Sequence, residues 1–407
     1  MDFVSIFSSL RRSALGPVLI GLQVALTLAI LLNAAGIVQQ HAQRMRSASG
    51  VDEANVFTLV NRWVGAPSFE QSRSMVARDL AILRATPGVQ AAVSTNGVPL
   101  AHRGWGTRVD TKPVDPASQG SLTRAQLYVL DEQGLDALGL HLQQGRWFTA
   151  DEAAGAGQSG SGFAILTRAL AAHLFPDGNA LGKLVYTSPR GNLVVGIVDT
   201  LQASAPGDPD VSLEVAQYSI ALPGKMAQQT LNNYIVRTKP GALQAAMKEA
   251  ERRLREADPQ RVITEFKTFA ETRQDSYRAN RALTTILVTV NLLLIVITAL
   301  GVAGLASYWV AQRQRMIGVR RALGATRLDI LAYFHAENLV IVTAGVLLGL
   351  GLAIALNTQL VKAGVPRIDN MYLWGGVVAV FLTGQLAVLL PALRAARVPP
   401  ALATRSG

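Results

Sequence analysis

Four long stretches without a formally charged residue constrain the fold of this chain more than any other feature. Each is at least 24 residues long, whereas about 20 apolar residues suffice to cross a bilayer as a helix. A block of mixed composition, more than 200 residues long, separates the first stretch from the second. The pattern predicts an α-helical membrane protein with four transmembrane helices, one before and three after a large soluble domain. The stretches are residues 13–43, 282–312, 338–361 and 370–393.

Composition and charge support this prediction. Of the 407 residues, 50% are hydrophobic and 16% are charged, which is typical of an integral membrane protein. The net charge is +11, and most of the excess falls in residues 1–12, 313–337 and 394–407. Because Lys and Arg gather in cytoplasmic loops, this excess indicates topology and not nucleic-acid binding. The chain has no cysteine, which excludes disulfides and thiolate metal sites.

The same charges predict the orientation. Both termini are expected in the cytoplasm, and the large domain on the opposite side of the membrane. The apolar run of residues 15–38 is longer than the hydrophobic region of a signal peptide, about 7–15 residues. We therefore expect an uncleaved first span.

Two βαβ patterns flank the soluble block. Each has a strand, a helix with apolar periodicity and a second strand, and together they predict a ferredoxin-like α+β subdomain. Residues 113–223 form an expected β-rich insertion between them. The expected strands are 55–60, 89–94, 233–238 and 261–266, with helices at 68–86 and 240–257, and the insertion strands are 125–130, 162–166, 184–187 and 193–198. The predicted domains are 1–43, 44–280 and 281–407.

Small residues mark helix-packing faces in the spans. Gly345 and Gly349 form a G-x-x-x-G pattern in the third span, and such residues let helices approach closely in lipid. The second span is long enough to continue out of the membrane as a stalk, and the fourth is expected to stop at Pro391. The first span carries a similar series that indicates either packing within the chain or a dimer seam: Gly16, Gly21, Ala25 and Ala29.

The segment between the second and third spans carries five arginines and two acids. Met316, Val319 and Leu323 have helical spacing, which predicts an amphipathic helix with arginines on its other faces. Gly324 interrupts the pattern. Thr326 and Asp329 then match a capping box that starts the next helix. The segment therefore predicts a short cytoplasmic helix, a turn and entry into the third span.

The charges of this segment allow two interpretations. Its arginines are compatible both with docking of a cytoplasmic partner and with contact to lipid phosphates. Glu337, at the cytoplasmic mouth of the third span, could bind a cationic partner group or pair with Arg327 or another local arginine. We favour the local pair for Glu337.

No motif predicts catalysis. A G-x-G-x-x-G string at 155–160 neither follows a strand nor opens a helix, and 178–183 lacks the Ser or Thr of a phosphate-binding loop. The five histidines show no i, i+4 pairing with a glutamate between them, and no G-x-S-x-G elbow occurs. We expect this chain to bind neither a metal nor a cofactor and to be a non-catalytic subunit.

Several strings resemble a known family. RMIGVRRALGATRLDILAYFHAENLVIVTAGVLLGLGLA, beginning at Arg315, is similar to the signature of the FtsX-like, MacB-type ABC-transporter permeases. PALRAARVPPAL at 391–402 is similar to their closing segment. In the soluble block, GRWF at 145–148, LTRALAAHLFP at 166–176, LGK at 181–183 and VGIV at 195–198 resemble their periplasmic domain.

This resemblance implies a permease subunit of a mechanotransmission-type transporter in the bacterial inner membrane, exporting a hydrophobic or peptide-like substrate. Two permeases would pair, as a homo- or heterodimer, and each would seat its coupling helix, within 313–328, in a separate cytoplasmic ABC ATPase that holds ATP and Mg. A periplasmic adaptor and an outer-membrane duct are further expected partners. The alternative is an FtsX-like signalling scaffold that activates a cell-wall hydrolase.

The matching positions supply the expected ATPase-coupling residues, with Glu337 as an acid at the membrane mouth. One position departs from the family pattern, because Met316 stands where the family has Glu. The coupling residues are Arg315, Ile317, Gly318, Arg320, Arg321, Gly324, Thr326 and Leu328.

Overall fold

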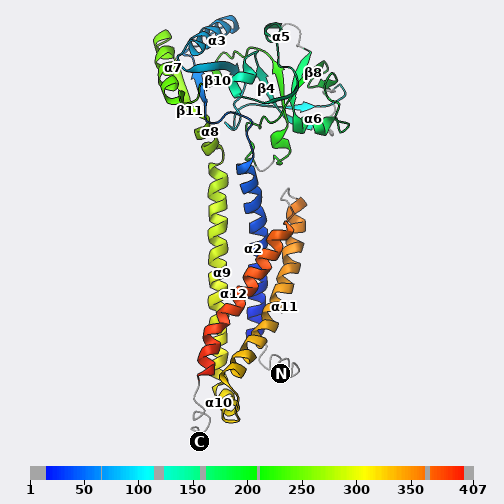
Figure 1. Ribbon diagram of the computed structural model, residues 1–407, viewed down its shortest axis with the longest axis vertical. Coiled ribbons are helices and arrows are strands. Elements are labelled where there is room, and N and C mark those ends of the chain that lie inside the picture. The colour runs from blue at the N-terminus through cyan, green and yellow to red at the C-terminus, as the bar shows by residue number, and fades with distance from the viewer. Residues whose placement is uncertain are drawn as a thin grey trace. The chain divides into compact units, whose positions relative to one another are not determined.

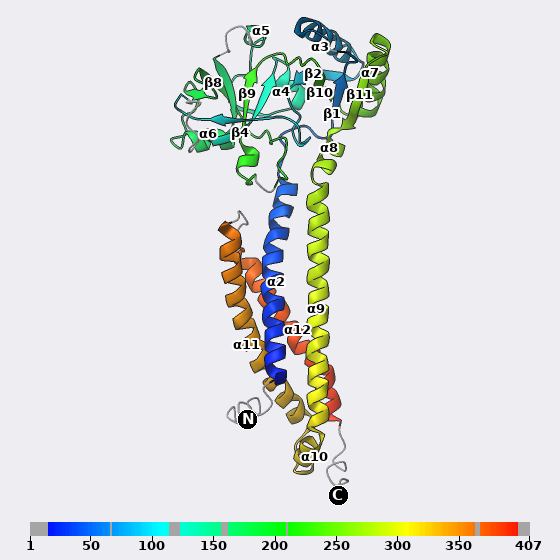
Figure 2. The ribbon, with the colours of Figure 1, turned by 180° about the vertical axis from the view of Figure 1, so that it is seen from behind.

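The computed structural model describes residues 15–65, 67–113, 123–155, 162–208, 211–362 and 367–397. The chain divides into a helical unit, residues 1–43 with 280–407, and an α+β unit, residues 44–279. Figures 1 and 2 show the two units from opposite sides.

The helical unit contains four helices that are long and apolar enough to cross a membrane. A fifth, short helix, α10, lies between the second and third of these. Exposed leucines, valines and isoleucines cover the long helices, as expected for surfaces that face lipid. The bounds are α2 Leu15–Arg46, α9 Arg278–Gln312, α10 Gln314–Ala322, α11 Arg327–Lys362 and α12 Asn370–Ala396.

Small residues let α2 and α11 approach closely. A Cβ on Gly345 would lie 2.7 Å from the carbonyl oxygen of Gly21, and one on Gly349 would lie 2.7 Å from that of Ala25. Both views show the two helices side by side. The small residues Gly21 and Ala25 of the first helix therefore pack within the chain.

Polar side chains add hydrogen bonds between the long helices. Thr27 and Thr298 share one of 2.7 Å between α2 and α9. The amide of Asn338 donates to the carbonyl of Gly384, joining α11 to α12 at 3.0 Å. Within an apolar bundle such bonds satisfy groups that lipid cannot.

The fourth long helix does not stop at Pro391, contrary to expectation. It continues through this proline to Ala396. Pro391, Ala392 and Ala395 are buried, and packing against neighbouring helices offsets the loss of one backbone hydrogen bond.

In the α+β unit, one sheet has the strand order β11-β1-β10-β2, with every pair antiparallel. Two helices, α3 and α7, pack on one face of it, where Leu80 and Leu254 join a core with Phe57 and Tyr234. Predicted strands and helices match these elements to within three residues at their ends. The bounds are β1 Val56–Arg62, α3 Phe69–Arg84, β2 Val89–Thr95, β10 Leu231–Thr238, α7 Leu243–Ala257 and β11 Val262–Thr268.

The second sheet has seven strands in the order β3-β4-β9-β6-β8-β5, with β7 paired to β8. The four predicted insertion strands are present, whereas β3, β5 and β9 were not expected from the sequence. The bounds are β3 Trp105–Val109, β4 Thr123–Leu130, β5 Leu142–Gly145, β6 Phe163–Thr167, β7 Leu184–Tyr186, β8 Gly191–Val198 and β9 Ser219–Pro223. The shorter helices are α4 Gly134–Leu138, α5 Ala150–Gly155, α6 Arg168–Leu174, η1 Val215–Gln217 and α8 Phe269–Ser276.

Candidate functional site

The α9–α10 junction is held by a largely buried ion pair. Arg313, the single residue between the two helices, directs Nη1 at both carboxylate oxygens of Glu337, at 2.7 and 2.9 Å. Their side chains are 17% and 2% exposed. Glu337 thus pairs with a local arginine, but not with Arg327. Arg327 begins the same helix ten residues earlier, which places it about 15 Å away along the axis.

One side of α10 anchors it to the helical unit. Ile317 is 1% exposed and belongs to the same buried cluster as Ile330 and Phe334 of α11 and Ala395 of α12. Gly318, beside it, is also buried. Burial of an isoleucine of this kind contributes about 1.5–3 kcal/mol.

The predicted apolar face of α10 points away from this anchor. Met316, Val319 and Leu323 are 37%, 45% and 83% exposed. Leu328, in the first turn of α11, is 74% exposed. These four side chains, which we call the apolar tip, present hydrophobic surface beside the last turns of the helical unit.

The turn between α10 and α11 has the predicted chemistry. Gly324 has φ +98°, a left-handed conformation that costs little only for glycine. The Asp329 backbone N–H donates to Thr326 Oγ1 at 3.2 Å, and the Thr326 N–H donates to Asp329 Oδ2 at 2.9 Å. This capping box fixes the direction in which α11 starts.

The arginines of α10 have different surroundings. Arg315 is exposed and makes no ion pair within the described residues. Arg320 lies over the ring of Tyr333, 4.6 Å from its centroid, in a cation–π contact. Arg321 is half-buried. The sequence did not indicate Tyr333, and it included Arg313 only as one of the local arginines that could pair with Glu337, because both contacts join different elements.

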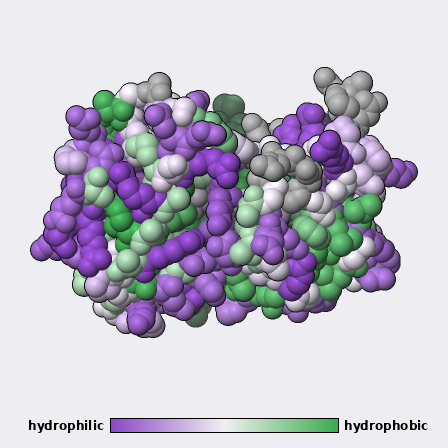
Figure 3. Space-filling model, turned by 90° about the horizontal axis from the view of Figure 1, so that it is seen from above, coloured by the Kyte–Doolittle hydropathy of each residue, from purple (hydrophilic) through white to green (hydrophobic). Residues whose placement is uncertain are grey.

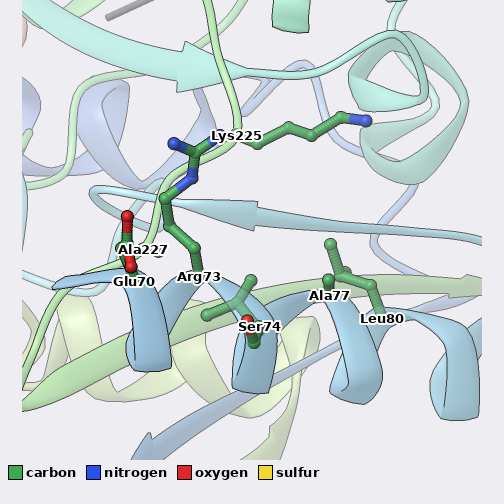
Figure 4. Close-up of a pocket in the computed structure, with 8 residues that line it drawn as sticks. Glu70, Arg73, Ser74, Ala77, Leu80, Lys225 and Ala227 are labelled. Carbon is green, nitrogen blue, oxygen red and sulfur yellow. The ribbon is translucent and has the colours of Figure 1, made fainter. Parts of the chain in front are cut away.

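The α+β unit offers a separate hollow of about 460 Å³ beside α3 (Figure 4). Arg73 and Lys225 border it together with Glu70, over apolar Ala77 and Leu80. It combines both charge signs. Across the described part of the chain, no three His, Asp or Glu side chains are grouped as metal ligands.

The family-like segment at 145–148 has a structural role in the α+β unit. Arg146 binds both carboxylate oxygens of Glu152, at 2.6 and 2.9 Å. The hydrogen bonds from Arg146 lower the pKa of Glu152 below its ordinary value. The N-terminal residues 1–12, most of the 155–160 string, and residues 398–402 of the closing segment lie outside the described residues.

Sequence comparisons cover almost the whole chain. Residues 18–254, more than half of it, match the family described as the MacB-like periplasmic core domain. Residues 288–400 match the FtsX-like permease C-terminal family. The chain belongs to the MacB-like, FtsX-like permease family. It is therefore a membrane protein with a MacB-like periplasmic domain.

The permease is similar to larger proteins described as macrolide export ATP-binding/permease protein MacB. The one from Campylobacter jejuni is 28% identical over 272 residues, which are 64% of this chain and 41% of the relative. The one from Wolinella succinogenes is 23% identical over 413 residues, covering 100% of this chain and 60% of the relative. The chain thus spans about two fifths to three fifths of the length of these relatives.

Two solved structures are similar to parts of the chain. The periplasmic region of MacB from Actinobacillus actinomycetemcomitans has 18% identity and a TM-score of 0.36, covering 57% of this chain and 97% of that one. The extracellular domain of the noncanonic ABC-type transporter YknZ from Gram-positive bacteria has 17% identity and a TM-score of 0.33. The match covers 51% of this chain and 100% of that one. TM-scores of this size do not establish a shared fold.

Proposed function

We propose that this chain is the permease subunit of a mechanotransmission-type ABC transporter and that α10 is its coupling helix. The main support for this proposal is the arrangement of α10, which is anchored on one side by Ile317 and by the ion pair between Arg313 and Glu337. On its other side it exposes the apolar tip. A rigid support with an exposed apolar end suits a docking surface for another protein.

The ATPase is proposed as a separate subunit that binds ATP and Mg. Met316, Val319 and Leu323 would enter an apolar pocket of the ATPase, and Arg315 would meet acidic groups at its rim. In this proposal Met316 contributes an apolar contact where the family pattern has Glu. Closure of two ATPase subunits would move α10 and, with it, the α9 and α11 helices that it joins.

The proposed topology follows from charge. Helices α2, α9, α11 and α12 would be the four spans, with both termini and α10 in the cytoplasm. We further propose that the sheet ordered β11-β1-β10-β2 is ferredoxin-like. Two β-α-β units interleave to make an antiparallel four-stranded sheet with both helices on one face, which supports this assignment.

The proposed output is movement of the periplasmic domain that exports a hydrophobic or peptide-like substrate, without passage of that substrate between the spans. A second permease copy or homologue would complete the machine, and an adaptor with an outer-membrane duct would extend it. The likeness to proteins described as macrolide exporters supports export.

The apolar tip provides a direct test. Leu323→Asp combined with Val319→Asp places charges where the proposed pocket is apolar, so ATPase capture should fall at least about tenfold, as expected when a central apolar contact is lost. Capture and ATP turnover would be measured after affinity purification of the tagged chain from mild-detergent membranes.

Val64→Asp is the matched control, because Val64 is also exposed, at 66%, but lies in the α+β unit. It should leave capture unchanged. Full capture and turnover by the double variant would contradict docking through α10. Recovery of a cell-wall hydrolase with the wild-type chain would instead support the signalling-scaffold alternative.

A further inference from the structure

A second hollow in the α+β unit lies beside strands β3 and β4 and has a volume of about 560 Å³. Its charged lining residues are Arg108 and Arg124, and no carboxylate lines it. Thr107 and Thr187 also line it. In this respect it differs from the hollow beside α3, where Glu70 accompanies the cations.

The two arginines are direct cross-strand partners. In the antiparallel pairing of β3 with β4, Arg108 stands opposite Arg124. Opposite residues share a face of the sheet with Cβ atoms about 4.5–5.5 Å apart, and like charges at this position are destabilising. The register therefore concentrates positive charge at one point of the hollow.

No carboxylate of the described chain forms an ion pair with either arginine. Neither guanidinium forms an ion pair or a side-chain hydrogen bond with any described residue. Gln126, two residues beyond Arg124, is engaged elsewhere. Its amide donates to the carbonyl of Trp105 at 3.0 Å and accepts from the Ser204 hydroxyl at 2.9 Å. The nearby Asp110 carboxylate accepts from the backbone N–H of Thr111 at 2.6 Å.

An oxyanion between the two guanidiniums would remove the repulsion. Each guanidinium presents a planar fork of donors that matches phosphate oxygens. A phosphate monoester carries about −1.5 to −2 charges at neutral pH, close to the two positive charges here. Ala203, Val211 and Val215 supply an apolar side to the same hollow, which suits an aliphatic group attached to the phosphate.

We propose that this hollow binds a phosphate group through Arg108 and Arg124. The phosphate belongs either to a free phosphate compound or to a lipid headgroup. This site requires neither α10 nor the ATPase, so it stands independently of the proposed transport function.

The first experiment titrates the full chain in neutral detergent with sodium phosphate, using sodium chloride at equal ionic strength as the reference. Isothermal titration and thermal unfolding should both show saturable binding. Arg108→Gln and Arg124→Gln should each weaken phosphate binding at least about tenfold, as expected for loss of charge-assisted hydrogen bonds.

The same variants provide a second readout without ligand. In phosphate-free buffer each should unfold at a temperature equal to or above that of the wild type, because one of two repelling charges is gone. Arg62→Gln is the matched control, since Arg62 is an exposed strand arginine whose cross-strand partners are Leu231 and Val262. It should bind phosphate like the wild type.

A second titration identifies the source of the phosphate. Water-soluble short-chain phosphatidic acid that binds more tightly than inorganic phosphate would support the lipid headgroup, and equal affinities would support a free phosphate compound. Absence of saturable binding to either probe, or equal binding by the wild type and both arginine variants, would overturn the proposal.

Discussion

At the scale of residues, a fully buried ion pair holds the helical layer of the α+β unit to its sheet. Arg261 donates to both carboxylate oxygens of Asp79, at 2.7 and 3.1 Å, and both side chains are 0% exposed. The hydroxyl of Tyr234 donates to the same carboxylate at 3.1 Å. Burial raises the pKa of Tyr234 well above its ordinary value, so this hydroxyl remains a donor.

Removing one member of this pair should lower the free energy of unfolding. Asp79→Ala leaves the Arg261 guanidinium buried without its counter-charge, which costs about 3–5 kcal/mol. The double variant Asp79→Leu with Arg261→Met should recover most of that loss, because it removes both charges. Urea unfolding of the full chain, followed through tryptophan fluorescence, would measure the difference, since Trp63, Trp105 and Trp147 lie in the α+β unit.

Arg252→Ala is the control for this prediction. Arg252 makes exposed ion pairs with Glu249 and Glu256 on α7, and such solvent-screened pairs contribute little to stability. A loss for Asp79→Ala no larger than that of Arg252→Ala would contradict a structural role for the buried pair.

At the scale of elements, the turn between α10 and α11 helps to hold the short helix α10 in place. Two local features set it, the left-handed Gly324 and the capping box of Thr326 and Asp329. Both act within a few residues and need no distant partner. Weakening the turn should therefore disturb α10 without disturbing membrane insertion.

The variants Gly324→Ala and Thr326→Ala test this. The first places a side chain at positive φ, which costs about 1–2 kcal/mol, and the second removes a cap worth about 1 kcal/mol. The chain has no native cysteine, so a nitroxide on Leu323→Cys reports on α10 without background. Its mobility should increase in both variants.

Gly304→Ala serves as the comparison, because a Cβ at Gly304 in α9 would meet nothing within 4 Å. In the Gly304→Ala variant, the nitroxide at position 323 should be as mobile as it is in Leu323→Cys alone. An immobile label in both turn variants would show that Ile317 and the Arg313 pair hold α10 by themselves.

At the scale of the whole molecule, the two units expose different surfaces. The face of the α+β unit in Figure 3 is mostly hydrophilic, with smaller hydrophobic patches. The long helices instead expose residues such as Leu300, at 68%, and Leu347, at 65%. Since lipid already satisfies apolar side chains, close backbone packing and hydrogen bonds must hold the helices together.

Gly345→Leu should therefore disrupt the helical unit. Even a Cβ there would lie 2.7 Å from the Gly21 carbonyl oxygen, and forcing larger groups into a packed interface typically costs about 1–3 kcal/mol. Gly351→Leu, on the same helix, should be tolerated because nothing lies within 4 Å of its Cβ position. Limited proteolysis and thermal unfolding in detergent would compare the stability of the two variants. Equal stability would contradict close packing of α11 on α2 at Gly345.

Much of this organisation could be predicted because its causes are local. The four apolar helices follow from composition along short windows, and the sheet that carries α3 and α7 follows from alternating periodicity. The capping box of Thr326 and Asp329 follows from a three-residue spacing. Strands β3, β5 and β9 were not predicted, and β5, with the sequence LQQG, shows no apolar alternation.

Local sequence patterns specify the long apolar helices, the βαβ units and the turn into α11, since each depends on neighbours within a few residues. Long-range packing brings Glu337 to Arg313, buries Ile317 of α10 and places Arg108 opposite Arg124. It also lets α12 continue through Pro391. These features depend on register and packing between segments far apart in the chain, and no local pattern encodes which partners meet.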